Sequence, residues 1–140
     1  MPAGHHVLTD AVVIIDGVDL SSDVESVGLD YFAEPQDVTT MGQGTRIRLG
    51  GLLDWSMSIT FKQNYSASRV DATLFPIVGT VVTVAVLPAD EDGATPDADD
   101  PEYTGSGLIE RYNPLGQTVG EAAGASCEIT SSGTLARNTS

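Results

Sequence analysis

Residues 55–62 read Trp-Ser-Met-Ser-Ile-Thr-Phe-Lys, the clearest strand pattern in the sequence. Large apolar side chains alternate with small or charged polar ones along its whole length. That period of two is typical of a strand with one face packed on a core. The opposite face is then left to meet water or another subunit.

Outward from this strand, the β pattern continues in both directions. Strands are predicted at 12–15, 24–32, 81–87, 103–112 and 119–130. The first ends at Asp16-Gly17, a pair typical of a two-residue hairpin turn. The second places Val27, Leu29 and Tyr31 together on one face, which we expect to be a core face.

Residues 67–78 are the helical candidate, because their apolar side chains recur at helical spacing. Ser68 stands where a weak capping box would begin. Pro76 removes a backbone hydrogen bond, so the last turn should be irregular. The fold class predicted for the single domain 1–140 is mainly β: a β-sandwich or barrel of about six or more strands with one short packed α-helix.

Residues 34–53 predict an extended hairpin arm, because glycines and Pro35 break any core pattern there. The predicted subunit interface consists of Arg46, Ile47, Arg48, Leu49, Leu52 and Leu53. A monomer would have to expose the four apolar side chains, and an arginine can bridge bidentately to a neighbour's carboxylate. The alternative is a flexible surface loop whose arginines only moderate the charge.

Three other segments stand apart from the strands. Residues 1–10 are expected to be a mobile N-terminus. Residues 88–101 are expected to form an acidic loop broken by prolines, and 133–140 a polar C-terminal tail that frays or docks on a neighbour. No membrane span or targeting signal is visible, so we expect synthesis in the cytoplasm.

The chain of 140 residues carries 20 acids against 6 bases, a formal net charge of −14. Duplex-binding proteins gain affinity from cations that displace counterions, so this chain is expected to repel nucleic acid. The simpler alternative is that the charge serves solubility alone. Cys127 is the single cysteine, which excludes an intrachain disulfide and predicts a buried, unreactive thiol.

No constellation of residues predicts catalysis. His5 and His6 are adjacent in the N-terminal segment, and no Gly-x-Ser-x-Gly motif presents a serine. The acidic run 90–93 fails the calcium-loop pattern, since Pro88 and Asp99 fall at its first and last ligand positions, and a looser ion site in this loop is the alternative. We therefore expect a protein that is not an enzyme and has no catalytic, cofactor-binding or metal site.

The order of several short stretches resembles the major tail-tube protein of long-tailed, siphovirus-type bacteriophages, in the small form common among phages of actinobacteria. The stretches that carry this resemblance are Ile14-Ile15-Asp16-Gly17-Val18-Asp19-Leu20-Ser21, Thr39-Thr40-Met41-Gly42, Gly51-Leu52-Leu53-Asp54-Trp55-Ser56, Val70-Asp71-Ala72-Thr73-Leu74-Phe75, Gly79-Thr80, Pro101-Glu102-Tyr103-Thr104-Gly105, Tyr112-Asn113-Pro114-Leu115, Val119-Gly120-Glu121 and Gly133-Thr134-Leu135. Together they span nearly the whole chain. Pro76 and the long acidic loop depart from the pattern.

The resemblance implies a structural subunit of a virion tail, made in the host bacterium. Six copies would form a ring, and rings would stack around a tape-measure protein, with tail-tip and terminator proteins at the ends. DNA would pass through an acidic lumen without specific binding; we expect Glu110, Glu121 and Glu128 to face it. The alternatives are another virion β-domain protein (capsid decoration or tail terminator) and a free-standing β-sandwich binding module.

Overall fold

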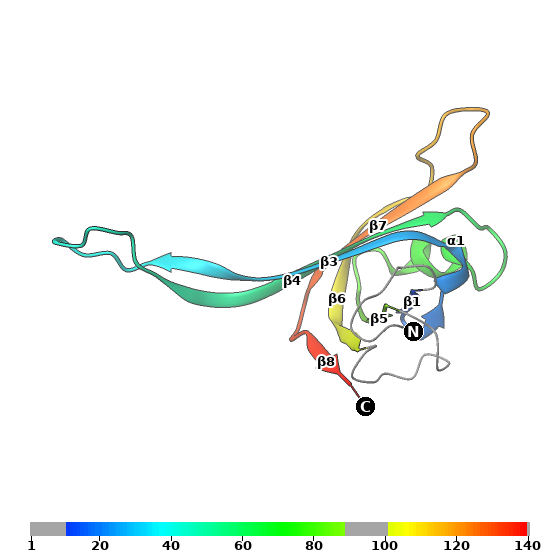
Figure 1. Ribbon diagram of the computed structural model, residues 1–140. Helices are drawn as coiled ribbons and strands as arrows, with labels where there is room; N and C mark the ends of the chain where they lie inside the picture. The colour runs from blue at the N-terminus through cyan, green and yellow to red at the C-terminus, as the bar shows by residue number, and fades with distance from the viewer. Residues whose placement is uncertain (1–10, 89–100, 140) are drawn as a thin grey trace, which may run out of the picture.

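The computed structural model describes residues 11–88 and 101–139 (Figure 1). The strands are β1 (Val12–Ile15), β2 (Val18–Asp19), β3 (Val24–Asp37), β4 (Arg48–Lys62), β5 (Val81–Leu87), β6 (Glu102–Asn113), β7 (Gly124–Ser131) and β8 (Ala136–Asn138). The helical turns are η1 (Ser21–Asp23), α1 (Val70–Leu74) and η2 (Phe75–Ile77). The N-terminal segment 1–10 and the acidic run within the predicted loop 88–101 lie outside the described residues.

The strands form one antiparallel sheet in the order β2-β1-β5-β6-β7-β4-β3, with β8 also paired to β6. Strand β6 links two layers, because β5 pairs with its first half and β7 with its second half. A register shift between Ile109 and Arg111 interrupts the β6–β7 ladder, as expected of a β-bulge. The β1–β5 layer and the β3–β4–β7 layer enclose the core between them (Figure 1).

The core is built on the strand that the sequence identified first. Trp55, Met57, Ile59 and Phe61 of β4 are all buried, which confirms the predicted alternation. They pack in one cluster with apolar side chains of β1, β5, β6 and β7. At one end of the sandwich, Val70 and Leu74 of α1 are also fully buried in this cluster.

The helix is shorter than the predicted range 67–78. The irregular last turn is confirmed, since the chain passes into 3-10 geometry at Phe75-Pro76-Ile77. The predicted capping box is wrong: Arg69 is the N-cap residue, and no side chain caps the helix. Ser68 has a left-handed φ of 62° and lies one residue too early to cap.

Other elements differ from the sequence prediction. The strand at 55–62 begins earlier, at Arg48, and runs through the glycine pair 50–51. The strand predicted from 119 begins only at Gly124, after a long connection. Tyr31 is 54% exposed instead of lying in the core, because β3 continues past the end of the opposite layer. The predicted tail contains β8, which pairs with β6 of its own chain.

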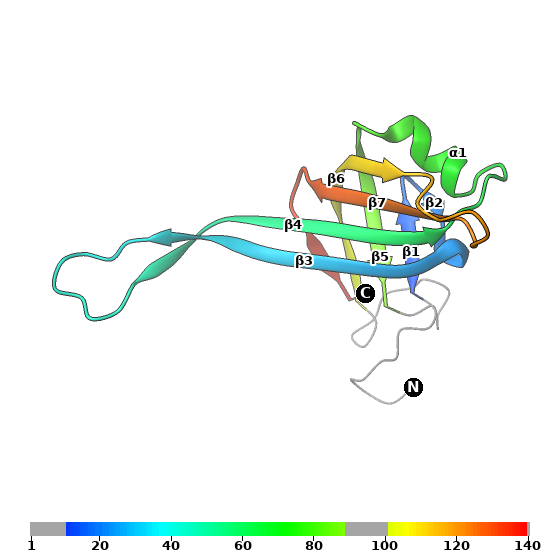
Figure 2. The same ribbon diagram turned by 90° about the horizontal axis from the view of Figure 1, so that it is seen from above.

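The second half of β3 and the first half of β4 leave the body as a two-stranded arm (Figures 1 and 2). The ladder continues to the pair Asp37–Arg48, with one register shift between Ala33 and Pro35. At this shift a Cβ on Gly51 would lie 2.8 Å from the carbonyl oxygen of Glu34. Glycine is therefore required there, because the two backbones approach too closely for a side chain.

Candidate assembly surfaces

The arm carries an apolar surface that nothing in the described chain covers. All six residues of the predicted interface lie on it: Arg46 and Ile47 just before β4, and Arg48, Leu49, Leu52 and Leu53 within β4. Ile47 is 41% exposed, Leu49 61%, Leu52 82% and Leu53 64%. Soluble monomers rarely expose so many large apolar side chains on one hairpin, so the arm is a candidate contact site.

The tip of the arm is ordered by polar contacts within the arm itself. Arg46 donates a 2.7 Å hydrogen bond to Asp37, and the Thr39 hydroxyl accepts a 2.7 Å bond from the Ile47 backbone NH. Hydrogen bonding by the Thr39 side chain, then by its backbone NH, and the Arg46 guanidinium lower the pKa of Asp37. Arg46 is thus already paired within its own arm, whereas Arg48 has no ion pair among the described residues.

The arm has no net charge, although the chain as a whole is acidic. Residues 34–53 contain two acids, Glu34 and Asp37, and two bases, Arg46 and Arg48. The remaining 18 acids and 4 bases therefore account for the whole net charge of −14. Contact through a neutral arm therefore brings less like charge together than contact through the acidic segments of the chain.

A second candidate surface is the outer face of β3, β4 and β7. The register places small polar side chains in rows across these strands: Asp30–Ser56–Thr130, Gly28–Ser58–Glu128 and Ser26–Thr60–Ser126. These residues are exposed or half-buried. These three rows contain no large apolar side chain, so this part of the face is suited to line a water-filled space.

The three acids predicted to face a lumen do not share one strand face. Glu128 projects from the polar face of β7, where its nearest ion-pair partner is Arg111 at 3.9 Å. Glu110 is exposed on β6 beside the register shift. Glu121 lies in the connection before β7, because that strand begins later than expected. A lumenal position for each acid stays a prediction.

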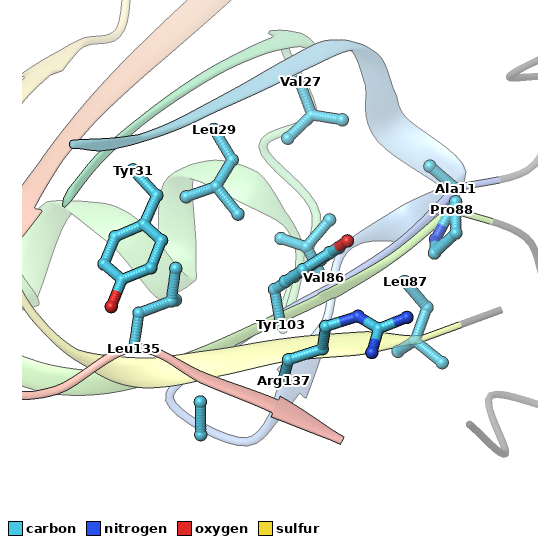
Figure 3. A pocket seen from close by; sticks show the side chains of 11 residues that line it. Ala11, Val27, Leu29, Tyr31, Val86, Leu87, Pro88, Tyr103, Leu135 and Arg137 are labelled. Atoms are coloured by element: carbon cyan, nitrogen blue, oxygen red, sulfur yellow. The ribbon is translucent and has the colours of Figure 1, made fainter. Parts of the chain in front are cut away.

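The third surface is an apolar groove of about 470 Å³ at the end of β5 away from α1 (Figure 3). Val27, Leu29 and Tyr31 of β3 form one wall, and side chains of β5, β6 and β8 form the other. The remaining lining residues are Ala11, Val86, Leu87, Pro88, Tyr103, Leu135, Ala136 and Arg137. A smaller cavity of about 300 Å³ is also lined by Tyr31 and Leu135. It extends to Leu53, where the arm joins the body; we call this place the arm root.

Sequence reasoning missed this groove and two further exposed apolar positions. Leu115 and Val119, in the connection between β6 and β7, are 75% and 102% exposed. Both are single apolar residues among glycines and polar residues, and this pattern could have predicted their exposure. The groove left no signal in the sequence, because its walls come from strands that lie far apart along the chain.

Residues 11–88 and 101–139 contain no group of three or more side chains placed to hold a metal ion. Within the same residues, no helix has the length and hydropathy to cross a membrane. Cys127 is buried, as predicted, and burial followed by the nearby Glu128 charge raises its pKa to about 12. Burial likewise raises the pKa of Tyr112 to about 12, with Asp71 accepting its hydroxyl.

These two raised pKa values predict a loss of stability in alkali. An ordinary thiol and phenol ionise near pH 8.5 and 10. Both groups therefore stay neutral in the fold while the unfolded chain ionises, and the stability they contribute is lost as pH rises from about 8.5 towards 12. In urea titrations, replacing Cys127 by Ala should flatten this fall between pH 8.5 and 11. Equal slopes in parent and variant would contradict the assignment to the thiol.

No protein-family model matches the sequence, and no curated protein matches it either. Solved structures match in fold. A chain of the virion of the native gene transfer agent particle superimposes with a TM-score of 0.75 at 18% identity, covering 96% of this chain and 100% of that one. A chain of the tail of the empty gene transfer agent particle, refined with C6 symmetry, gives 0.74 at 19% identity, covering 97% and 100%.

The SPP1 tail tube gives a TM-score of 0.70 at 12% identity, covering 94% of this chain and 77% of that chain. At these identities the likeness establishes the fold. The predicted fold class, mainly β with one short helix in a tail-tube-like arrangement, is therefore confirmed. The narrower resemblance to proteins from phages of actinobacteria stays a prediction.

Proposed function

We propose that this chain is a structural subunit of a phage-type tail tube, working in the virion as a polymer of itself and without catalytic activity. The apolar arm is the observation that carries the proposal. It projects from a folded body, exposes Leu49, Leu52 and Leu53, and is held in shape by its own hydrogen bonds. A protein that works alone gains nothing from such an arm, whereas a polymer buries it.

The likeness to tail and tail-tube structures, one of them refined with C6 symmetry, supports stacked hexameric rings. In such a ring the polar face of β3, β4 and β7 is suited to line the lumen. Its rows carry hydroxyl side chains with Asp30 and Glu128, and Lys62 of β4 and Arg111 of β6 are ion-paired with Glu25 and Glu128, so few cations are free to hold phosphates. DNA then slides through without specific binding, and a tape-measure protein occupies the lumen before it.

Within this proposal, the tube's other partners are tail-tip and terminator proteins at its ends. The chain is made in the host cytoplasm and ends in the virion tail. A capsid decoration protein or a tail terminator of similar β architecture is the second candidate. Both would form a closed oligomer of fixed size, so polymer length separates them from a tube subunit.

Imaging of the purified protein by negative-stain electron microscopy, with sedimentation at rising concentration, tests the proposal. We expect stacked rings or tubes of indefinite length, and no retention of duplex DNA at moderate salt. A monomer at every concentration over a broad range of salt would overturn the proposal. A single oligomer of fixed size would favour the decoration or terminator alternative.

A further inference from the structure

The apolar groove lies at the open end of the sandwich. Its walls are formed by Val27, Leu29 and Tyr31 of β3 on one side and by Leu87 and Tyr103 on the other (Figure 3). The opposite end, where β5 begins, is closed by the buried side chains of α1. No part of residues 11–88 or 101–139 covers the groove, so two apolar surfaces of this chain, arm and groove, lack a partner.

The chain's own arm cannot fill its own groove. In both views the arm leads away from the body, and its tip is the part of the described chain furthest from it (Figures 1 and 2). The β3–β4 ladder continues to Asp37–Arg48 and keeps the arm extended. We propose that the groove receives the arm of a second copy of this chain, an inference that rests on the proposed function.

The two surfaces match in chemistry. The arm presents aliphatic side chains, with Leu52 82% exposed and Met41 fully exposed at the tip. Methionine adapts to irregular apolar cavities. A groove of about 470 Å³ has room for several such side chains.

They also match in charge. Among the described residues that line the groove, Arg137 carries the charge. Glu34 on the arm has no ion pair among the described residues. Without Glu34, the rest of the arm has one acid, Asp37, and two bases, Arg46 and Arg48, so its approach to an acidic neighbour meets little repulsion.

The geometry of this contact differs from that of a symmetric dimer. The donor surface is the arm and the acceptor surface is the groove, and every copy carries one of each. Such a head-to-tail contact leaves a free arm and a free groove after each addition. It therefore continues into rings or open stacks instead of stopping at two copies.

Two variants test the contact: Tyr31→Lys in the groove and Leu52→Lys on the arm. Tyr31 is 54% exposed, so a lysine there has access to water in the monomer. Tyr65→Lys is the matched control, since Tyr65 is 59% exposed and lines neither surface. All three changes make the chain one charge less acidic, so added repulsion cannot explain a loss of assembly.

We expect each groove or arm variant alone to need at least about a tenfold higher concentration to assemble, while Tyr65→Lys assembles like the parent. A one-to-one mixture of Tyr31→Lys and Leu52→Lys should form a dimer and stop there. Only one arm and one groove in that pair are intact, so growth cannot continue. Analytical ultracentrifugation distinguishes monomer, dimer and polymer.

The remaining outcomes overturn the inference in different ways. If Tyr31→Lys assembles like the parent, the groove is not the acceptor, and the proposed function still stands. If Tyr31→Lys unfolds at a clearly lower urea concentration than Tyr65→Lys, the groove is filled by another part of its own chain. If the parent itself stays monomeric, both the inference and the proposed function are wrong.

Discussion

A chain in which Leu49, Leu52 and Leu53 are all replaced by Ser will stay folded and will need at least about a hundredfold higher concentration to assemble. The three side chains are 61%, 82% and 64% exposed, so the monomer loses little core packing. Burial of one leucine contributes about 1.5–3 kcal/mol, and about 1.4 kcal/mol is a tenfold change in an equilibrium constant. Sedimentation of parent and variant over a common concentration series measures the difference.

The matched control replaces Leu115 and Val119 by Ser, since these residues are as exposed but lie outside the arm. The control should assemble like the parent. If the triple variant assembles at the parental concentration, the arm carries no contact. If only the control loses assembly, the contact lies at the connection between β6 and β7.

The arginines of the arm give a less direct test than the leucines. Replacing Arg46 by Glu removes its 2.7 Å bond to Asp37 and places two acids side by side, so the tip itself is disturbed. Arg48 has no ion pair within the described chain. Arg48→Glu therefore reports on contacts with another copy more cleanly than the double replacement does. A bridge from either arginine to a neighbour's carboxylate stays a prediction.

Replacing Trp55 by Ala should lower the free energy of unfolding by about 3–5 kcal/mol, the usual cost of emptying a large aromatic site. Trp55 is 2% exposed, and its ring packs so closely on β6 that a Cβ on Gly105 would lie 3.1 Å from Cζ2. Its indole NH donates a 2.9 Å hydrogen bond to the carbonyl oxygen of Gly133. Urea unfolding followed by far-UV circular dichroism measures the change, since the variant has no tryptophan to report by fluorescence.

Trp55→Phe separates the two contributions, because it keeps an aromatic ring and removes the donor to Gly133. We expect it to cost clearly less than Trp55→Ala. Phe75→Ala is the control at an aromatic side chain that is 69% exposed, and it should change stability by less than about 0.5 kcal/mol. Equal effects of Trp55→Ala and Phe75→Ala would contradict the packing of Trp55 in the core.

Much of the fold was predictable because strict alternation records which side chains face a core. It placed Trp55, Met57, Ile59 and Phe61 correctly. The alternation of apolar and polar residues does not show how far the opposite layer extends. It therefore assigned Tyr31 to the core, although β3 continues beyond the end of that layer. It also gave no sign of β8, whose three residues are held by pairing with β6 and not by a pattern of their own.

The arm was predictable as a candidate site for a different reason. Apolar side chains in a glycine-rich segment have no core to enter, so exposed leucines are visible in the sequence itself. The groove is not visible there, because residues 27–31 meet residues 86–88, 103 and 135–137 only after folding. Which acids share a face depends on the register shift in β6 and the late start of β7, and neither leaves a sequence signal.

The bond between Trp55 and Gly133 joins residues 78 positions apart, and β8 adds its pairing to β6 only after that point in the chain. During synthesis, the strands that carry the arm emerge long before the segment that locks its root. Pairings of such long sequence separation form late, and incompletely folded β-proteins are prone to wrong association. A nascent chain from which residues 133–138 have not yet emerged therefore lacks both the bond to Trp55 and the β6–β8 pairing, and the base of its arm is not yet fixed.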